Sequence, residues 1–206
     1  DDLRELDVDA STLDLKQRWA EAQHLRTQMQ TYDKLSFQDP KAREPWLQAN
    51  VFMKLLDLLA RGGQCRLHGN NVRLHHNHNS TYSTPDATFT HKHQISVSPR
   101  TAGPVFELEC TIAEENSFDK QNHFENGQGQ VVKYMIVEAL AETQGSYVEG
   151  RKRFRGVLTD CRSVRFYYLD GKQLTFHRSA PFELLTDADE PTEGFVLLLR
   201  LLQASP

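Results

Sequence analysis

Apolar residues recur at helical spacing in three parts of the chain. Between residues 11 and 35 they lie three and four positions apart, which predicts a first helix. A second helix is predicted at residues 44–61, where Pro45 suits the first turn and a glycine pair suits the end. Residues 128–143 return to the same spacing and predict a third helix.

The segments between and after these helices alternate with a period of two. Residues 65–113 are interrupted by Asn, Pro and Gly, which predicts an antiparallel meander of three or four strands. Further strands are predicted after the third helix, at residues 156–159, 164–169 and 174–177. Residues 194–203 fit either a closing helix or a strand. This order predicts an α/β fold, in which a mixed central β-sheet is flanked by helices.

The composition is that of an ordinary globular chain. Of 206 residues, 38% are hydrophobic and 25% are charged, and a chain of this length can form a hydrophobic core without disulfides or structural metal ions. We divide the chain into an N-terminal helical arm at residues 1–43 and a domain at residues 44–206. Because the first residue is not Met, we expect a domain cut from a longer protein. The formal net charge of −4 means that nucleic acid would have to be bound by a local basic patch.

The cysteines and the hydropathy pattern indicate a cellular compartment. Cys65, Cys110 and Cys161 are far apart, which argues against a disulfide scaffold or a cysteine-based zinc site and fits a reducing compartment. No apolar run approaches the roughly 20 residues of a membrane span, and no signal peptide is recognisable. We therefore expect an intracellular protein of the nucleus or cytoplasm that does not bind membranes, and the oligomeric state stays open.

One predicted strand carries two acids among core residues. On a strand from residue 105 to 112, Glu107 and Glu109 share a face and lie about 7 Å apart, so they repel unless a cation or a proton lies between them. Asp86 starts the preceding strand region and is expected to approach the same point. Converging carboxylates suit Mg²⁺ or Mn²⁺, because hard cations take oxygen ligands. Alternatively, both glutamates lie on the solvated face of an edge strand.

The third helix and the segment after it carry further candidates. Gln130 and Tyr134 are one turn apart and share a face, with Lys133 beside them, although ordinary packing also explains such a pair. One dense basic patch follows, formed by Arg151, Lys152, Arg153 and Arg155. This patch either holds a nucleic-acid backbone or is a solvated basic loop.

In this order and spacing, the motifs resemble those of the PD-(D/E)XK nucleases, the restriction-endonuclease-like superfamily. The matching residues are Pro85 with Asp86, then Glu107, then Gln130 with Tyr134. RecB-like members and Crinkler-type effector domains are the most similar branches. The resemblance covers roughly residues 44–178 and implies a core of helix, three strands, helix and strand, to which this chain adds an N-terminal helix.

The resemblance also implies an activity, namely metal-dependent hydrolysis of phosphodiester bonds in nucleic acid. Asp86 and Glu107 would hold Mg²⁺ or Mn²⁺, and Gln130 with Tyr134 would orient substrate or water. The basic patch at residues 151–155 would hold phosphate.

One position departs from the family pattern. The family has a lysine where this chain has Glu109, and a carboxylate cannot stabilise the negative charge that develops on a phosphate. Either Glu109 is a third metal ligand, or the lysine has moved to Lys133 or Lys92, or the site is inactive. The two functions that follow are a nuclease and an inactive nuclease-like module that binds a protein or nucleic-acid partner within a larger protein.

Overall fold

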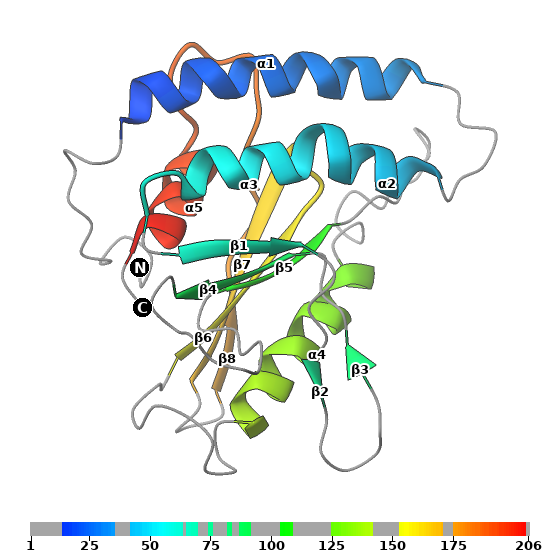
Figure 1. Ribbon diagram of the computed structural model, residues 1–206, viewed down its shortest axis with the longest axis vertical. Coiled ribbons are helices and arrows are strands. Elements are labelled where there is room, and N and C mark those ends of the chain that lie inside the picture. The colour runs from blue at the N-terminus through cyan, green and yellow to red at the C-terminus, as the bar shows by residue number, and fades with distance from the viewer. Residues whose placement is uncertain are drawn as a thin grey trace.

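The structure, a computed structural model, describes ten segments of the chain. They are residues 14–35, 42–63, 65–69, 74–75, 82–83, 87–91, 104–108, 125–141, 153–170 and 175–204. The helices are α1 (Leu15–Lys34), α2 (Arg43–Leu47), α3 (Met53–Ala60), α4 (Glu125–Ala141) and α5 (Glu193–Gln203), with a π-helical turn at Gln48–Phe52. Figure 1 shows one sheet with α1, α3 and α5 on one side and α4 on the other.

The sheet contains both parallel and antiparallel pairs. Within the described segments its strands are β1 (Cys65–Gly69), β4 (Ala87–His91), β5 (Val105–Leu108), β6 (Arg153–Thr159), β7 (Ser163–Asp170), β8 (Thr175–Arg178) and β9 (Phe182–Glu183). Their order is β1-β4-β5-β6-β7-β8, and β9 pairs with β7. Among the described strands only β5 and β6 pair in parallel, and α4 lies between them in the chain. The predicted mixed sheet flanked by helices is therefore confirmed. Of the predicted antiparallel meander, β1, β4 and β5 pair in antiparallel ladders in this sheet.

A short hairpin stands apart from this sheet. It consists of β2 (Leu74–His75) and β3 (Tyr82–Ser83), which pair with each other in an antiparallel ladder. Part of the predicted meander, including residues 109–112 of the strand predicted at residues 105–112, lies outside the described residues.

The helices α1, α3 and α5 share one hydrophobic core with the sheet. Trp19, Leu25 and Met29 of α1 are buried in this core, at the spacing that predicted the helix. The indole of Trp19 also donates a hydrogen bond to the carbonyl of Ala188, at 3.3 Å, just before α5. The arm boundary predicted at residue 43 stays a prediction, but α1 itself is part of this packing.

A second, smaller core lies between the sheet and α4. Its members are Val105, Val131, Tyr134, Met135, Phe154, Leu158, Tyr167 and Leu169. Strand alternation explains the division of residues between the two cores, since Phe154 and Leu158 face α4 whereas Val157 belongs to the larger core. The strands β5, β6 and β7 are thus largely buried on both faces, which is typical of strands that pair in parallel.

The connection from β6 to β7 is held by its own side chains. The carboxylate of Asp160 accepts hydrogen bonds from the backbone N–H groups of Arg162 (2.9 Å) and Ser163 (2.7 Å). The hydroxyl of Thr159 donates to the carbonyl of Ser163 at 2.7 Å. Between them Cys161 has φ of 68°, a left-handed conformation that few residues other than glycine adopt readily. These bonds fix the point where β6 ends and β7 begins.

The closing segment is helical, which decides the alternative left open for residues 194–203. Its N-cap is Thr192, whose hydroxyl oxygen accepts a hydrogen bond from the backbone N–H of Phe195 at 3.2 Å and donates to the carbonyl of Leu184 at 2.9 Å. The hydroxyl therefore satisfies one helix donor and one loop acceptor.

The Thr192→Ala variant is expected to lose about 1–2 kcal/mol of unfolding free energy, because both hydrogen bonds of the cap are removed. Thr192→Ser keeps the hydroxyl and is the matched control, with a smaller loss expected. Urea denaturation of the two variants measures the difference. Equal losses would mean that the methyl group, and not the cap, stabilises this end of α5.

Candidate nuclease site

Glu107 is a buried carboxylate on an interior strand. β5 lies between β4 and β6, and the side chain of Glu107 is 8% exposed. The alternative that places Glu107 on the solvated face of an edge strand is therefore wrong. A carboxylate loses hydration on burial, and a protein offsets that cost with hydrogen bonds, an opposite charge or a metal ion.

The side chain of Glu107 faces α4. Val105, two positions earlier on the same strand, belongs to the core under α4, and residues two apart on a strand share a face. In the neighbouring strand Glu107 lies opposite Leu158, which lies opposite Arg165 on β7. Arg165 is also 8% exposed. We call these three residues the Glu107–Arg165 row.

Gln130 and Tyr134 are in contact, as their spacing predicted. The hydroxyl of Tyr134 donates a hydrogen bond to Oε1 of Gln130 at 3.0 Å. Tyr134 is buried in the core under α4, whereas Gln130 and Lys133 are exposed. Tyr134 therefore packs against the same face of the sheet that carries Glu107, while the ammonium group of Lys133 is on the solvent side of the helix.

Two of the predicted carboxylates, Asp86 and Glu109, lie outside the described residues. Their chain neighbours are described. Ala87, which follows Asp86, pairs with Phe106, which precedes Glu107. Leu108, which precedes Glu109, pairs with Thr159 at the end of β6.

The basic patch is described only in part. Arg151 and Lys152 lie outside the described residues, and Arg153 begins β6. Arg155 is partly buried and alternates along β6 with Phe154, which faces α4. Arg155 therefore lies on the opposite face of the sheet from Glu107. The structure does not bring these two side chains together.

Sequence reasoning did not single out Arg165 and Tyr167, which both face α4. Burial raises the pKa of the Tyr167 phenol above its usual value, and the nearby guanidinium of Arg165 opposes that rise. The guanidinium of Arg165 thus lies beside a phenol that stays protonated at neutral pH. The available signal was a single charged residue inside the apolar and aromatic run 164–169.

Of the three predicted metal ligands, Glu107 lies within the described residues. Within the described segments no three His, Cys, Asp or Glu side chains are grouped to hold a metal ion. The other two predicted ligands, Asp86 and Glu109, are outside those segments. The side chain of Glu107, near the carboxyl end of β5, offers one oxygen donor of the kind that Mg²⁺ or Mn²⁺ prefers.

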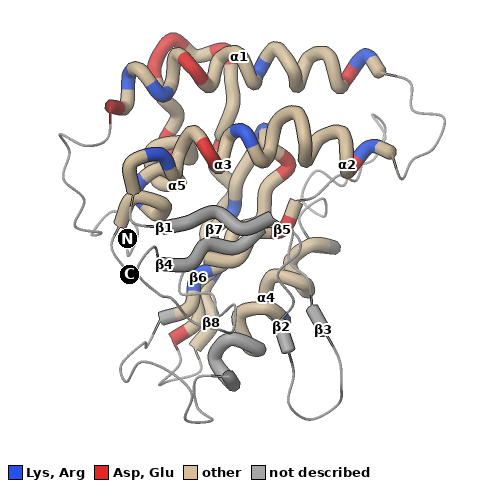
Figure 2. The backbone as a smooth tube through the Cα atoms, viewed as in Figure 1, with Lys and Arg blue, Asp and Glu red and all other residues tan. Residues whose placement is uncertain are grey.

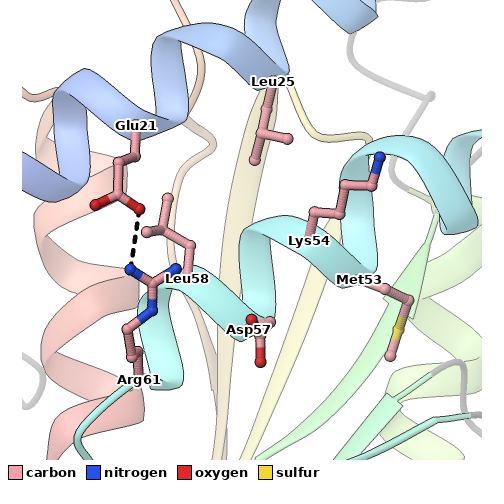
Figure 3. A pocket seen from close by; sticks show the side chains of 7 residues that line it. All are labelled: Glu21, Leu25, Met53, Lys54, Asp57, Leu58 and Arg61. Atoms are coloured by element: carbon pink, nitrogen blue, oxygen red, sulfur yellow. Dashed lines mark hydrogen bonds and ion pairs between the residues drawn. The ribbon is translucent and has the colours of Figure 1, made fainter.

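A groove of about 540 Å³ lies on the other side of the sheet, between α1 and α3 (Figure 3). It is lined by Glu21, Leu25, Met53, Lys54, Asp57, Leu58 and Arg61. Arg61 Nη1 and Glu21 Oε2 form an ion pair at 3.0 Å, and hydrogen bonds from Gln17 and Arg61 hold the pKa of Glu21 below its usual value. Figure 2 shows that both signs of charge are interspersed along α1 and α3. This mixture gives the groove no preference for a phosphate.

Comparison with known proteins adds no relative to this picture. No family model, curated protein or solved structure matches the chain. Among the described helices, none combines the length and the apolar character needed to cross a membrane.

Proposed function

We propose that this chain is a metal-dependent nuclease domain of the PD-(D/E)XK type, which hydrolyses phosphodiester bonds in nucleic acid with Mg²⁺ or Mn²⁺. The observation that carries the proposal is the burial of Glu107 on an interior strand beneath α4. Such a position is costly for a carboxylate, and coordination of a hard cation is one arrangement that offsets the cost.

The order of elements supports the proposal. Apart from the β2–β3 hairpin that lies between β1 and β4, the chain runs from α3 through the antiparallel strands β1, β4 and β5 to α4 and then to β6. This is the order of helix, three strands, helix and strand that the motif resemblance implies. Because β5 and β6 are parallel, their carboxyl ends meet at one edge of the sheet, where α/β proteins commonly bind ligands. Glu107 is one residue from that end of β5.

Chain connectivity supports a metal shared by Asp86 and Glu107. Each is the direct neighbour of one member of the Ala87–Phe106 pair, and consecutive Cα atoms are about 3.8 Å apart. Glu109 would contribute a third oxygen from the continuation of the same segment. The metal would supply a Lewis acid and a hydroxide nucleophile at neutral pH.

The other residues would bind and orient the substrate. The Tyr134 hydroxyl, held by Gln130, would fix a water or a phosphate oxygen at the sheet face of α4. Arg151 to Arg155 would hold the nucleic-acid backbone, as in the motif family. Arg155 faces away from Glu107, so it would hold a part of the backbone away from the scissile phosphate.

A second function, an inactive module that binds a partner, is favoured by one observation. Glu109 stands where the family has its lysine, and the candidate replacement Lys133 is exposed on α4. In that case the buried carboxylate would be a remnant of an ancestral site, and a protein or nucleic-acid partner would be bound elsewhere.

A metal titration separates the two functions. We expect Mg²⁺ and Mn²⁺ to bind the wild type in calorimetry and binding to be lost in Asp86→Asn/Glu107→Gln. The matched control is Glu44→Gln/Asp57→Asn, which removes two exposed acids from the helices on the other side of the sheet. Cleavage of single- and double-stranded DNA and of RNA is measured on the same samples.

The outcomes differ for the two functions. Metal binding together with cleavage, both lost in the site variant and kept in the control, supports the nuclease. No metal bound by the wild type, with or without nucleic acid, excludes the nuclease and favours the partner-binding module. Metal binding without cleavage of any of the three substrates also argues for the module.

A further inference from the structure

We propose that Arg165 provides the positive charge of the candidate site and contacts the scissile phosphate there. This inference rests on the proposed nuclease function, because it names a further residue of the same site. A nuclease site of this kind needs a positive charge besides the metal ion. A phosphodiester is an anion, and it must approach a site built from carboxylates, so a cation besides the metal lowers the repulsion.

The position of Arg165 in the sheet carries the inference. Within the described segments, the buried charged side chains on the α4 face of the sheet are Glu107 and Arg165. They lie in one row, with only Leu158 between them. Two interstrand spacings separate their Cα atoms by about 10 Å, a gap that a long arginine side chain can largely cross.

The chemistry of a buried guanidinium fits this role. Arginine is rarely buried unless acceptors surround it, and its planar fork binds two oxygens of a phosphate at once. Tyr167, two positions along β7 on the same face, adds a protonated hydroxyl next to Arg165. Both groups donate hydrogen bonds, which is what a phosphate accepts.

The other described cationic side chains near the candidate site are less well placed than Arg165 to contact a phosphate beside Glu107. Lys133 is exposed on α4, and Arg155 is on the opposite face of the sheet. Arg178 on β8 is exposed, and its Nη1 donates to Oε1 of Gln128 at 2.9 Å. Arg165 alone among these four is buried on the sheet face that carries Glu107.

The test compares Arg165→Met with Arg26→Met by Mg²⁺ calorimetry and by cleavage of the nucleic acid that the wild type cuts best. Arg26 pairs with Asp187 at the surface on the α1 side of the sheet. In Arg165→Met we expect cleavage to fall about 100-fold, as when one preorganised donor is removed from an active site. We also expect Mg²⁺ affinity to rise by at least about 4-fold, the effect of removing one positive charge about 10 Å from a divalent ion in water, because the guanidinium reaches closer than that. Arg26→Met is expected to change neither quantity.

These opposite shifts distinguish an electrostatic role from a structural one, because a damaged fold would weaken metal binding and cleavage together. Arg165→Lys restores the charge and is expected to recover part of the cleavage and the wild-type Mg²⁺ affinity. Arg165→Gln replaces the Met variant if that variant does not fold. Wild-type cleavage by a neutral variant, or no recovery by Arg165→Lys, overturns the inference while the nuclease function stands. A wild type that neither binds metal nor cleaves overturns both.

Discussion

The Gly156→Ala variant is expected to be about 3 kcal/mol less stable than the wild type, at the upper end of overpacking costs. Gly156 is the point of β6 on which α4 rests. A Cβ added there would come within 2.7 Å of Met135 Sδ and closer still to Val131 Cγ1. The Met135 side chain can move, but Val131 is β-branched and fixed on its helix, so α4 would have to lift.

The Gly129→Ala variant is the matched control on α4 itself. A Cβ there meets no atom within 4 Å, and Gly129 lies inside the helix. We expect a gain of about 0.5–1 kcal/mol from the reduced backbone entropy of the unfolded chain and the better helix propensity of alanine. Urea denaturation of both variants measures the two shifts, which should have opposite signs. A Gly156→Ala protein as stable as the wild type would contradict the close contact between α4 and β6.

The Arg18→Met variant is expected to lose about 3 kcal/mol, because each hydrogen bond from a charged group contributes about 1.5–3 kcal/mol. Arg18 is buried, and its guanidinium caps the C-terminal end of α3. It donates to the carbonyl of Leu58 and, at 2.6 Å, to that of Arg61. Burial and the nearby charge of Arg61 lower the pKa of Arg18, so the charge is held at a cost that these acceptors offset. Removing the guanidinium leaves helix-end carbonyls without these donors.

Arg26→Met is the control for this substitution as well. Arg26 lies on the same helix as Arg18, and its ion pair with Asp187 is at the surface. Exposed ion pairs of this kind contribute at most about 1 kcal/mol. Thermal unfolding of both variants compares them directly. Equal small losses would show that water replaces the Arg18 hydrogen bonds, and that α1 is held by its apolar face alone.

The helices were the most predictable part of the fold. The apolar spacing predicted α1 at residues 11–35, and the structure has it at Leu15–Lys34. Residues 44–61 were predicted as one helix, whereas the structure inserts a π-helical turn at Gln48–Phe52. A π-helical turn adds a residue without changing which side chains are apolar, so spacing alone does not reveal it.

The sheet was predictable in kind and less so in pairing. Alternation identified the strands, but the parallel pair of Val105 with Gly156 joins positions about fifty residues apart. That register depends on which side chains each strand buries under α4, a property of the assembled layers. The segment that became α5 was ambiguous because a short apolar run fits either structure. The Thr192 cap is the local feature that agrees with a helix.

The candidate site was also predictable in part: its residue types could be read from the sequence, but their positions in the sheet could not. Glu107 was predicted from its chemistry, yet only the position of β5 inside the sheet separates a buried acid from a solvated one. Arg165 was not singled out from the sequence, because it is a single charged residue within an apolar and aromatic run. Both faces of β7 are largely buried, so apolar residues occur on both faces and the sequence does not show which face Arg165 is on. Its place in the Glu107–Arg165 row follows only from the strand pairing.

The packing of α1 can be followed by the intrinsic fluorescence of the chain's tryptophans. Both tryptophans of the sequence lie where α1 packs: the Trp19 ring is 4.9 Å from Phe195 of α5, and the Trp46 ring of α2 is 5.5 Å from Tyr32 of α1. The layer under α4 has tyrosines and no tryptophan among its core residues. Indole emission therefore follows the packing of α1 and responds little to α4. Comparing the fluorescence transition with the transition of total helix content, followed by circular dichroism, shows whether the two helical layers separate from the sheet together or in turn.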